Sequence, residues 1–72
     1  MSFPERLKEL QRARNVPKVE VLRSVGLDRT SYFCYEKGQR EPTISKLTAL
    51  ADYFNVSTDY LLGRTDNPQI AR

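Results

Sequence analysis

The stretch from Pro17 to Gly38, PKVEVLRSVGLDRTSYFCYEKG, decides the fold of this 72-residue chain. Gly26 is expected to end one short helix, because glycine adopts the positive φ of a helix C-terminus without steric cost. Asp28 stands where the next helix needs an N-cap, since its carboxylate can accept hydrogen bonds from free N–H groups of the first turn. That helix is predicted over residues 29–37 and ends at Gly38. Two short helices joined by a glycine-containing turn predict a helix-turn-helix.

The segments on either side of this motif also have helical patterns. Ser2 and Glu5 have the spacing of a capping box at the start of a first helix, and Thr43 and Ser57 are expected to cap two later helices. The first helix is expected to bury Phe3, Leu7, Leu10 and Ala13. The helix after Thr43 is expected to bury Ile44, Leu47, Leu50, Ala51 and Phe54. Other faces of the first helix carry Arg6, Lys8, Arg12 and Arg14, which would meet solvent or a phosphate.

Length and composition restrict the class of protein. Seventy-two residues suffice for one small domain with a modest core. No apolar run is long enough to span a bilayer, and the N-terminus does not read as a signal segment. The single cysteine, Cys34, cannot form an internal disulfide, which favours a reducing compartment. The sequence therefore predicts a soluble, cytoplasmic protein without a membrane partner.

The residue types that catalysis and metal binding need are scarce. Histidine is absent, the cysteine is alone, and no nucleophile stands beside a base. No glycine-rich loop is available for a phosphate. We therefore expect no enzyme activity, no metal site, no cofactor and no small-molecule ligand.

The positive charge is concentrated in the part of the chain that carries the motif. Residues 1–40 hold nine Lys or Arg against five Asp or Glu, whereas residues 41–72 hold three against four. A basic helix-turn-helix region favours a polyanionic partner over a neutral one. A solvated surface without a partner is the other interpretation of the same charges.

The chain resembles the phage repressor/Cro type of helix-turn-helix domain, the XRE family. The matching segments are GLDRTS at 26–31, YEKG at 35–38, REPT at 40–43, LADYFNVS at 50–57 and DYLLG at 59–63. This resemblance extends over roughly residues 3–68 and implies an all-α fold, a single five-helix repressor-like domain. We expect residues 1–63 to form the domain and 64–72 a flexible tail. It also implies operator DNA as a partner and a bacterial host cell as the location.

In this family the second helix of the motif enters the major groove with its outward face. At about 100° per residue, Tyr32, Tyr35 and Glu36 fall on the inward face, flanked by Ser31. The outward face carries Thr30, Phe33, Cys34 and Lys37, with Arg29 at its edge. The candidate DNA contacts combine this outward face with positions where relatives touch the phosphate backbone. They are Lys18, Arg29, Thr30, Cys34, Lys37, Gln39 and Arg40.

Some positions depart from the family pattern. Lys18 stands where relatives have a glutamine that contacts a phosphate, and Leu22 stands where they prefer alanine. Glu36 often pairs with an arginine of the first helix. The aligned residue here is Gln11, so a hydrogen bond is expected, unless Arg12 or Arg14 replaces it.

The centre of the outward face, Phe33 with Cys34, is apolar where a groove-reading surface is polar. Phenylalanine offers a base edge only contact with a thymine methyl. Exposed aromatic residues near arginine are common anchors of protein interfaces. The other interpretation of Phe33 is local packing beside Leu22.

This apolar centre favours a partner-capture hypothesis. In size and in its aromatic recognition helix, the chain is similar to the modulator-of-repression antirepressors of temperate phages. Such a protein would bind the N-terminal domain of the repressor of the same switch and block operator binding, with residual or joint DNA binding left open. The residues assigned to this contact are Arg23, Arg29, Thr30, Tyr32, Phe33, Tyr35 and Lys37. The alternative is a Cro-like repressor that binds operator DNA itself.

Overall fold

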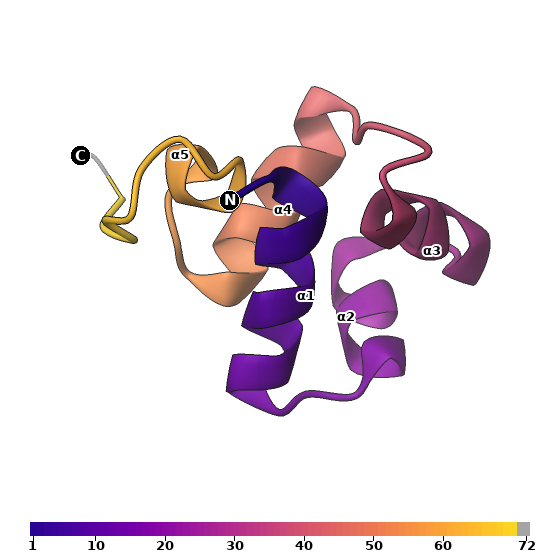
Figure 1. Ribbon diagram of the computed structural model, residues 1–72. Helices are drawn as coiled ribbons and strands as arrows, with labels where there is room; N and C mark the ends of the chain where they lie inside the picture. Colours follow the sequence, from indigo (N-terminus) through magenta and orange to yellow (C-terminus); the bar gives the residue numbers. More distant parts are fainter. Residues whose placement is uncertain (71–72) are drawn as a thin grey trace.

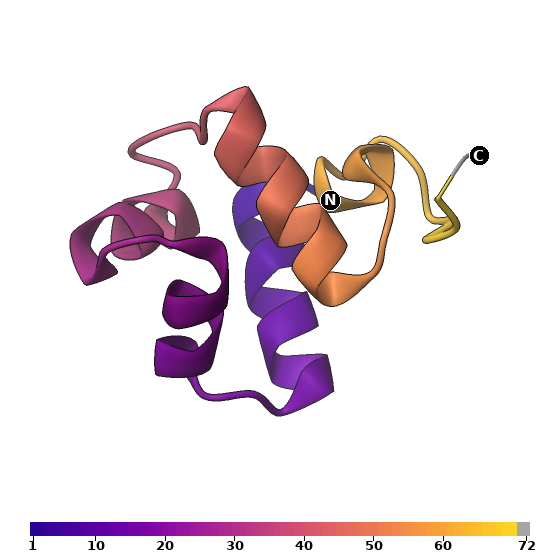
Figure 2. The same cartoon turned by 180° about the vertical axis from the view of Figure 1, so that it is seen from behind.

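The computed structural model describes residues 1–70, and these residues form an all-helical fold without strands. The helices are α1 (Phe3–Arg14), α2 (Lys18–Val25), α3 (Arg29–Lys37), α4 (Ile44–Phe54) and α5 (Thr58–Leu61). Helix α1 packs on α3, α2 packs on α4, and α5 packs on both α1 and α4. Helices α2 and α3 lie at one end and α5 at the opposite end, with α1 and α4 between them (Figures 1 and 2). The predicted five-helix fold is confirmed.

The turn between α2 and α3 forms as the sequence predicted. Gly26 has φ of 75°, and its N–H donates to the Leu22 carbonyl at 2.9 Å. Asp28 caps α3: its carboxylate accepts from the Ser31 hydroxyl at 2.7 Å and from the Ser31 N–H at 3.0 Å. These hydrogen bonds lower the pKa of the Asp28 carboxyl, the one from the Ser31 side chain most. Gly38, with φ of 73°, ends α3.

The core lies between the helices and draws on every one of them. Its buried apolar residues are Leu7, Leu10, Val21, Val25, Tyr32, Tyr35, Leu50, Ala51, Phe54, Val56 and Leu61. Two predictions for the core were wrong, because Ala13 is exposed and Ile44 is 84% exposed. Ala13 lies in the last turn of α1, and Ile44 is the first residue of α4. Helical spacing indicated an apolar stripe on each helix but not how far along the helix that stripe is covered.

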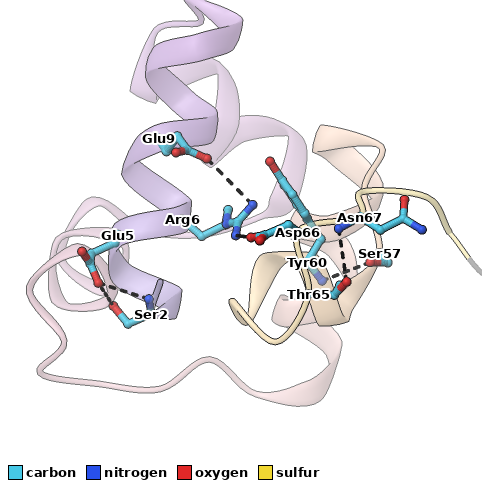
Figure 3. Close-up of polar contacts among 9 residues, drawn as sticks. All are labelled: Ser2, Glu5, Arg6, Glu9, Ser57, Tyr60, Thr65, Asp66 and Asn67. Carbon is cyan, nitrogen blue, oxygen red and sulfur yellow. Dashed lines mark hydrogen bonds and ion pairs between the residues drawn. The ribbon is translucent and has the colours of Figure 1, made fainter.

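Arg6 is a further correction, because it lies in the interior and not on a solvated face of α1. The side chain is only 4% exposed, and its guanidinium carbon lies 3.7 Å from the centroid of the Tyr60 ring. Its nitrogens pair with Asp66 at 3.4 Å and with Glu9 at 3.9 Å (Figure 3). Helix α5 and the residues after it fold over the first turn of α1, which encloses this arginine.

The segment after α5 contacts the domain. The Ser57 N–H donates to the Pro68 carbonyl at 2.9 Å, and the Arg64 N–H donates to the Asp59 carbonyl at 2.9 Å. Together with the Arg6–Asp66 pair, these bonds return the chain to α5 and α1. The flexibility of residues 64–72 stays a prediction. Residues 71–72 lie outside the described part of the chain.

Tyr32 has a buried hydroxyl that finds no hydrogen-bond partner among residues 1–70. Burial raises the pKa of this phenol, and the nearby Glu36 carboxylate raises it further. Because an unpaired buried hydroxyl is costly, Tyr32→Phe is expected to raise the free energy of unfolding by about 1 kcal/mol. Urea unfolding at pH 7 measures this, with Tyr35→Phe as the matched control. A less stable Tyr32→Phe variant would contradict the prediction.

Candidate nucleic-acid interface

Helix α3 has the two faces that its sequence predicted. Tyr32, Tyr35 and Glu36 are buried, and Ser31 is half-buried at their flank. On the opposite side Arg29, Thr30, Phe33 and Lys37 are exposed, whereas Cys34 is half-buried. We call the outward residues Arg29, Thr30, Phe33, Cys34 and Lys37 the α3 face.

Phe33 is 51% exposed at the centre of the α3 face. The ring borders a hollow of about 180 Å³ between α2 and α3, with Leu22 and Tyr32 among its lining residues. The Lys37 Nζ lies 5.4 Å from the ring centroid, and Lys37 and Phe33 together border a second hollow. Local packing beside Leu22 therefore covers only part of the ring, and about half of it faces solvent.

Two residues predicted to touch a partner lie in the core instead. Tyr32 is 1% exposed and Tyr35 is 4% exposed. The Tyr35 ring meets the Phe3 ring of α1 edge-on, with the centroids 6.1 Å apart. Their spacing of three residues places both tyrosines on the buried side of α3, so neither belongs to the α3 face.

Glu36 pairs with Lys18 and not with the first helix. The Lys18 Nζ lies 2.9 Å from the Glu36 Oε1, and Glu36 is only 8% exposed. The Gln11 amide donates instead to the Val16 carbonyl at 3.0 Å, and the Arg14 guanidinium donates to the Phe54 carbonyl. Because Lys18 begins α2 close to α3, it reaches this buried carboxylate directly. Lys18 was predicted as a phosphate contact, and the structure adds a role in joining the two helices of the motif.

Lys18→Ala is expected to lower the free energy of unfolding by about 1 kcal/mol, because Glu36 would lose its partner while staying mostly buried. The loss is limited because the Lys18 side chain is 53% exposed. Lys18→Arg, which keeps the charge, is the matched control and is expected to retain most of the stability. Urea unfolding of the three proteins measures the difference. If Lys18→Ala is as stable as the wild type, the ion pair makes no net contribution.

Basic residues flank the α3 face on both sides. On one side, a hollow of about 430 Å³ between α1 and α2 is lined by Lys8 and Arg12 together with Lys18. On the other side Gln39 and Arg40 are exposed, and the Arg40 guanidinium donates to the Ser31 hydroxyl at 3.0 Å. This contact holds Arg40 near the first turn of α3.

From the sequence, Lys8 and Arg12 were expected to meet either solvent or a phosphate, and they were not distinguished from Arg6 and Arg14. The spacing of four residues between Lys8 and Arg12 places both on one face of α1, and this signal could have identified them. Lys8 also borders a smaller hollow of about 200 Å³ that includes Phe33 and Lys37. Because α1 packs against α3, the basic groups of α1 lie next to the α3 face.

Within residues 1–70, no helix combines the length and the apolar character needed to cross a membrane. In the same residues, no three His, Cys, Asp or Glu side chains gather as metal ligands would.

A short exposed helix, held by a glycine turn on a five-helix scaffold and flanked by basic groups, defines a small helix-turn-helix protein. The chain belongs to the helix-turn-helix domain family, whose model matches residues 5–67.

Among its relatives, the cryptic phage CTXphi transcriptional repressor RstR of Vibrio cholerae is 37% identical over 71 residues, covering 96% of this chain and 63% of that protein. The uncharacterized HTH-type transcriptional regulator YobD of Bacillus subtilis is 36% identical over 66 residues, covering 92% of this chain and 59% of that protein. The HTH-type transcriptional regulator ImmR of Bacillus subtilis is 33% identical over 66 residues, covering 92% of this chain and 52% of that protein. The chain thus spans between half and two thirds of the length of these relatives.

The DNA-binding domain of the P22 C2 repressor has the same fold. The two structures align with a TM-score of 0.80 at 24% sequence identity, covering 86% of this chain and 82% of the other.

Proposed function

We propose that this chain is a phage-type transcription regulator that binds operator DNA by placing α3 in the major groove, in the cytoplasm of a bacterial host cell. The observation that carries the proposal is an exposed α3 face with basic groups on both sides. The relatives named as transcriptional regulators and repressors support it, and among them is a phage repressor.

The residues divide into those that read bases and those that bind phosphates. Arg29 begins α3 and is exposed, so its guanidinium can donate two hydrogen bonds to the major-groove edge of a guanine. Thr30 beside it can contact several base edges. The candidates for phosphate contacts are Lys8, Arg12, Lys18, Lys37, Gln39 and Arg40.

Selection of binding sequences from a pool of random duplexes tests this function. The enriched duplex is then titrated by fluorescence anisotropy at several salt concentrations. With about four phosphates neutralised per chain, the logarithm of the binding constant should fall with that of the salt concentration at a slope of about −3 to −4. Failure to enrich any sequence, with no salt-dependent binding at micromolar protein, would refute the proposal.

A second candidate function is capture of the repressor of the same genetic switch, as an antirepressor would do. It is favoured by the half-exposed Phe33 ring, because burial of a large aromatic side chain stabilises protein interfaces. Arg29, Thr30 and Lys37 would form the polar rim. Arg23 would add a charge contact, and its side chain is 73% exposed. Tyr32 and Tyr35, which are buried, leave this set.

Two titrations of the isotope-labelled chain separate the two functions. One adds the selected duplex, and the other adds the N-terminal domain of the proposed partner, the repressor of the same genetic switch. Partner capture predicts that the NMR signals of Phe33 and Arg23 shift with the repressor domain. Shifts that occur only with DNA, at sub-micromolar affinity, would exclude partner capture.

A further inference from the structure

We infer that Phe33 reads the C5-methyl group of a pyrimidine in the operator, an inference that rests on the proposed DNA-binding function. The methyl group belongs to thymine in unmodified DNA and to 5-methylcytosine in methylated DNA. Binding is then sensitive to a methyl group at this carbon, whichever of the two bases carries it.

The position of the ring in the α3 face is the first step. Phe33 lies at the centre of the exposed face, one turn after Arg29 and one turn before Lys37. In a helix-turn-helix, the N-terminal half of the second helix faces the base edges. With Arg29 on a guanine, the Phe33 ring lies about 6 Å further along the helix, or roughly two base-pair steps away.

The chemistry of the ring is the second step. Phenylalanine has no donor or acceptor, so it cannot pair with the polar groups that guanine, adenine and cytosine present in the major groove. Contact with the ring would remove water from each of those polar groups without giving it a new hydrogen-bond partner. The thymine methyl is the apolar group in this groove, and contact with it removes apolar surface of both partners from water.

The surroundings of the ring are the third step. On its α2 side the ring and Leu22 form an apolar wall of the 180 Å³ hollow, and Arg29 borders the same hollow. The Lys37 ammonium lies 5.4 Å from the ring centroid. The apolar surface offered by Phe33 and Leu22 is therefore small, and the cations Arg29 and Lys37 lie close to it. Such a surface can contact the methyl group of a base, while the cations beside it can contact the negatively charged phosphates that flank this base.

Deoxyuridine provides the test, because it differs from thymidine only by the missing methyl group. Each thymine of the selected duplex is replaced singly by deoxyuridine, and affinity is measured by fluorescence anisotropy. At one position in each site, wild-type binding is expected to weaken about fourfold, which corresponds to about 0.8 kcal/mol for one buried methyl. Phe33→Ala is expected to bind the thymine and deoxyuridine duplexes equally at that position.

Cytosine at the same position gives an independent measurement. Methylation of that cytosine at C5 is expected to strengthen wild-type binding about fourfold and to leave Phe33→Ala binding unchanged. Ile44→Ala is the matched control, because it removes an exposed apolar side chain away from the α3 face. This control should keep the full wild-type response to each methyl group.

The inference is overturned if no thymine-to-deoxyuridine change weakens wild-type binding, or if Phe33→Ala shows the same loss as the wild type. Either result can arise with a tight, sequence-specific and salt-dependent complex, so it would leave the proposed function intact. Failure of the proposed function is recognised earlier, when the selection enriches no sequence.

Discussion

Arg29→Ala is expected to weaken binding of the selected duplex by about 5- to 150-fold, a loss of about 1–3 kcal/mol in binding free energy. Arg29 is the first residue of α3 and is exposed, and its planar guanidinium can make two hydrogen bonds to the major-groove edge of a guanine. Its loss removes a contact that distinguishes guanine from the other bases.

The measurement is fluorescence anisotropy with the selected duplex and with single-base variants of it. Arg29→Ala should lose discrimination at one base pair, where the wild-type protein prefers guanine. Arg64→Ala is the matched control, because Arg64 is equally charged and its side chain is 73% exposed after α5, far from α3 (Figure 1). If Arg29→Ala weakens binding to every duplex by the same factor, Arg29 contacts a phosphate and does not read a base.

Phe54→Ala is expected to lower the free energy of unfolding by about 3–5 kcal/mol. The Phe54 side chain is 0% exposed and meets the Tyr53 ring edge-on, with the centroids 5.0 Å apart. Domains are typically stabilised by about 0.05–0.15 kcal/mol per residue, so this loss would remove much of the stability of a chain of 72 residues. Thermal unfolding followed by circular dichroism measures it.

Ile44→Ala is the matched control for Phe54→Ala. Both residues belong to the stripe that helical spacing assigns to the core, yet Ile44 is 84% exposed. Its replacement is expected to change the free energy of unfolding by no more than about 0.5 kcal/mol. Equal losses for the two variants would mean that Ile44 is buried in solution.

The candidate site was predicted in part. The exposure of Thr30, Phe33 and Lys37 follows from their angular positions on α3, and the structure confirms it. The assignment of Tyr32 and Tyr35 to a partner contact was wrong, because both side chains are buried in the core. The hollow that Lys8 and Arg12 line was not predicted, since its lining residues come from α1, α2 and α3 and meet only in the folded chain.

The sequence by itself determined where the helices begin and end. Gly26, Asp28, Gly38 and Thr43 were assigned correctly because the groups they satisfy lie within about one helical turn of each of them. Residues so close along the chain meet in almost any fold that keeps the helix. Helical periodicity likewise indicated which side of each helix is apolar.

Only the tertiary structure decided which charged residues pair and which apolar residues are covered. The Lys18–Glu36 and Arg6–Asp66 pairs join residues 18 and 60 positions apart, so they depend on how α2 meets α3 and on how the chain returns after α5. Ile44 and Ala13 lie near helix ends and are exposed, although helical spacing places them with the apolar residues of α4 and α1. The physical reason is that burial and long-range pairing depend on the distances between helices, which local hydrogen bonds and side-chain periodicity leave open.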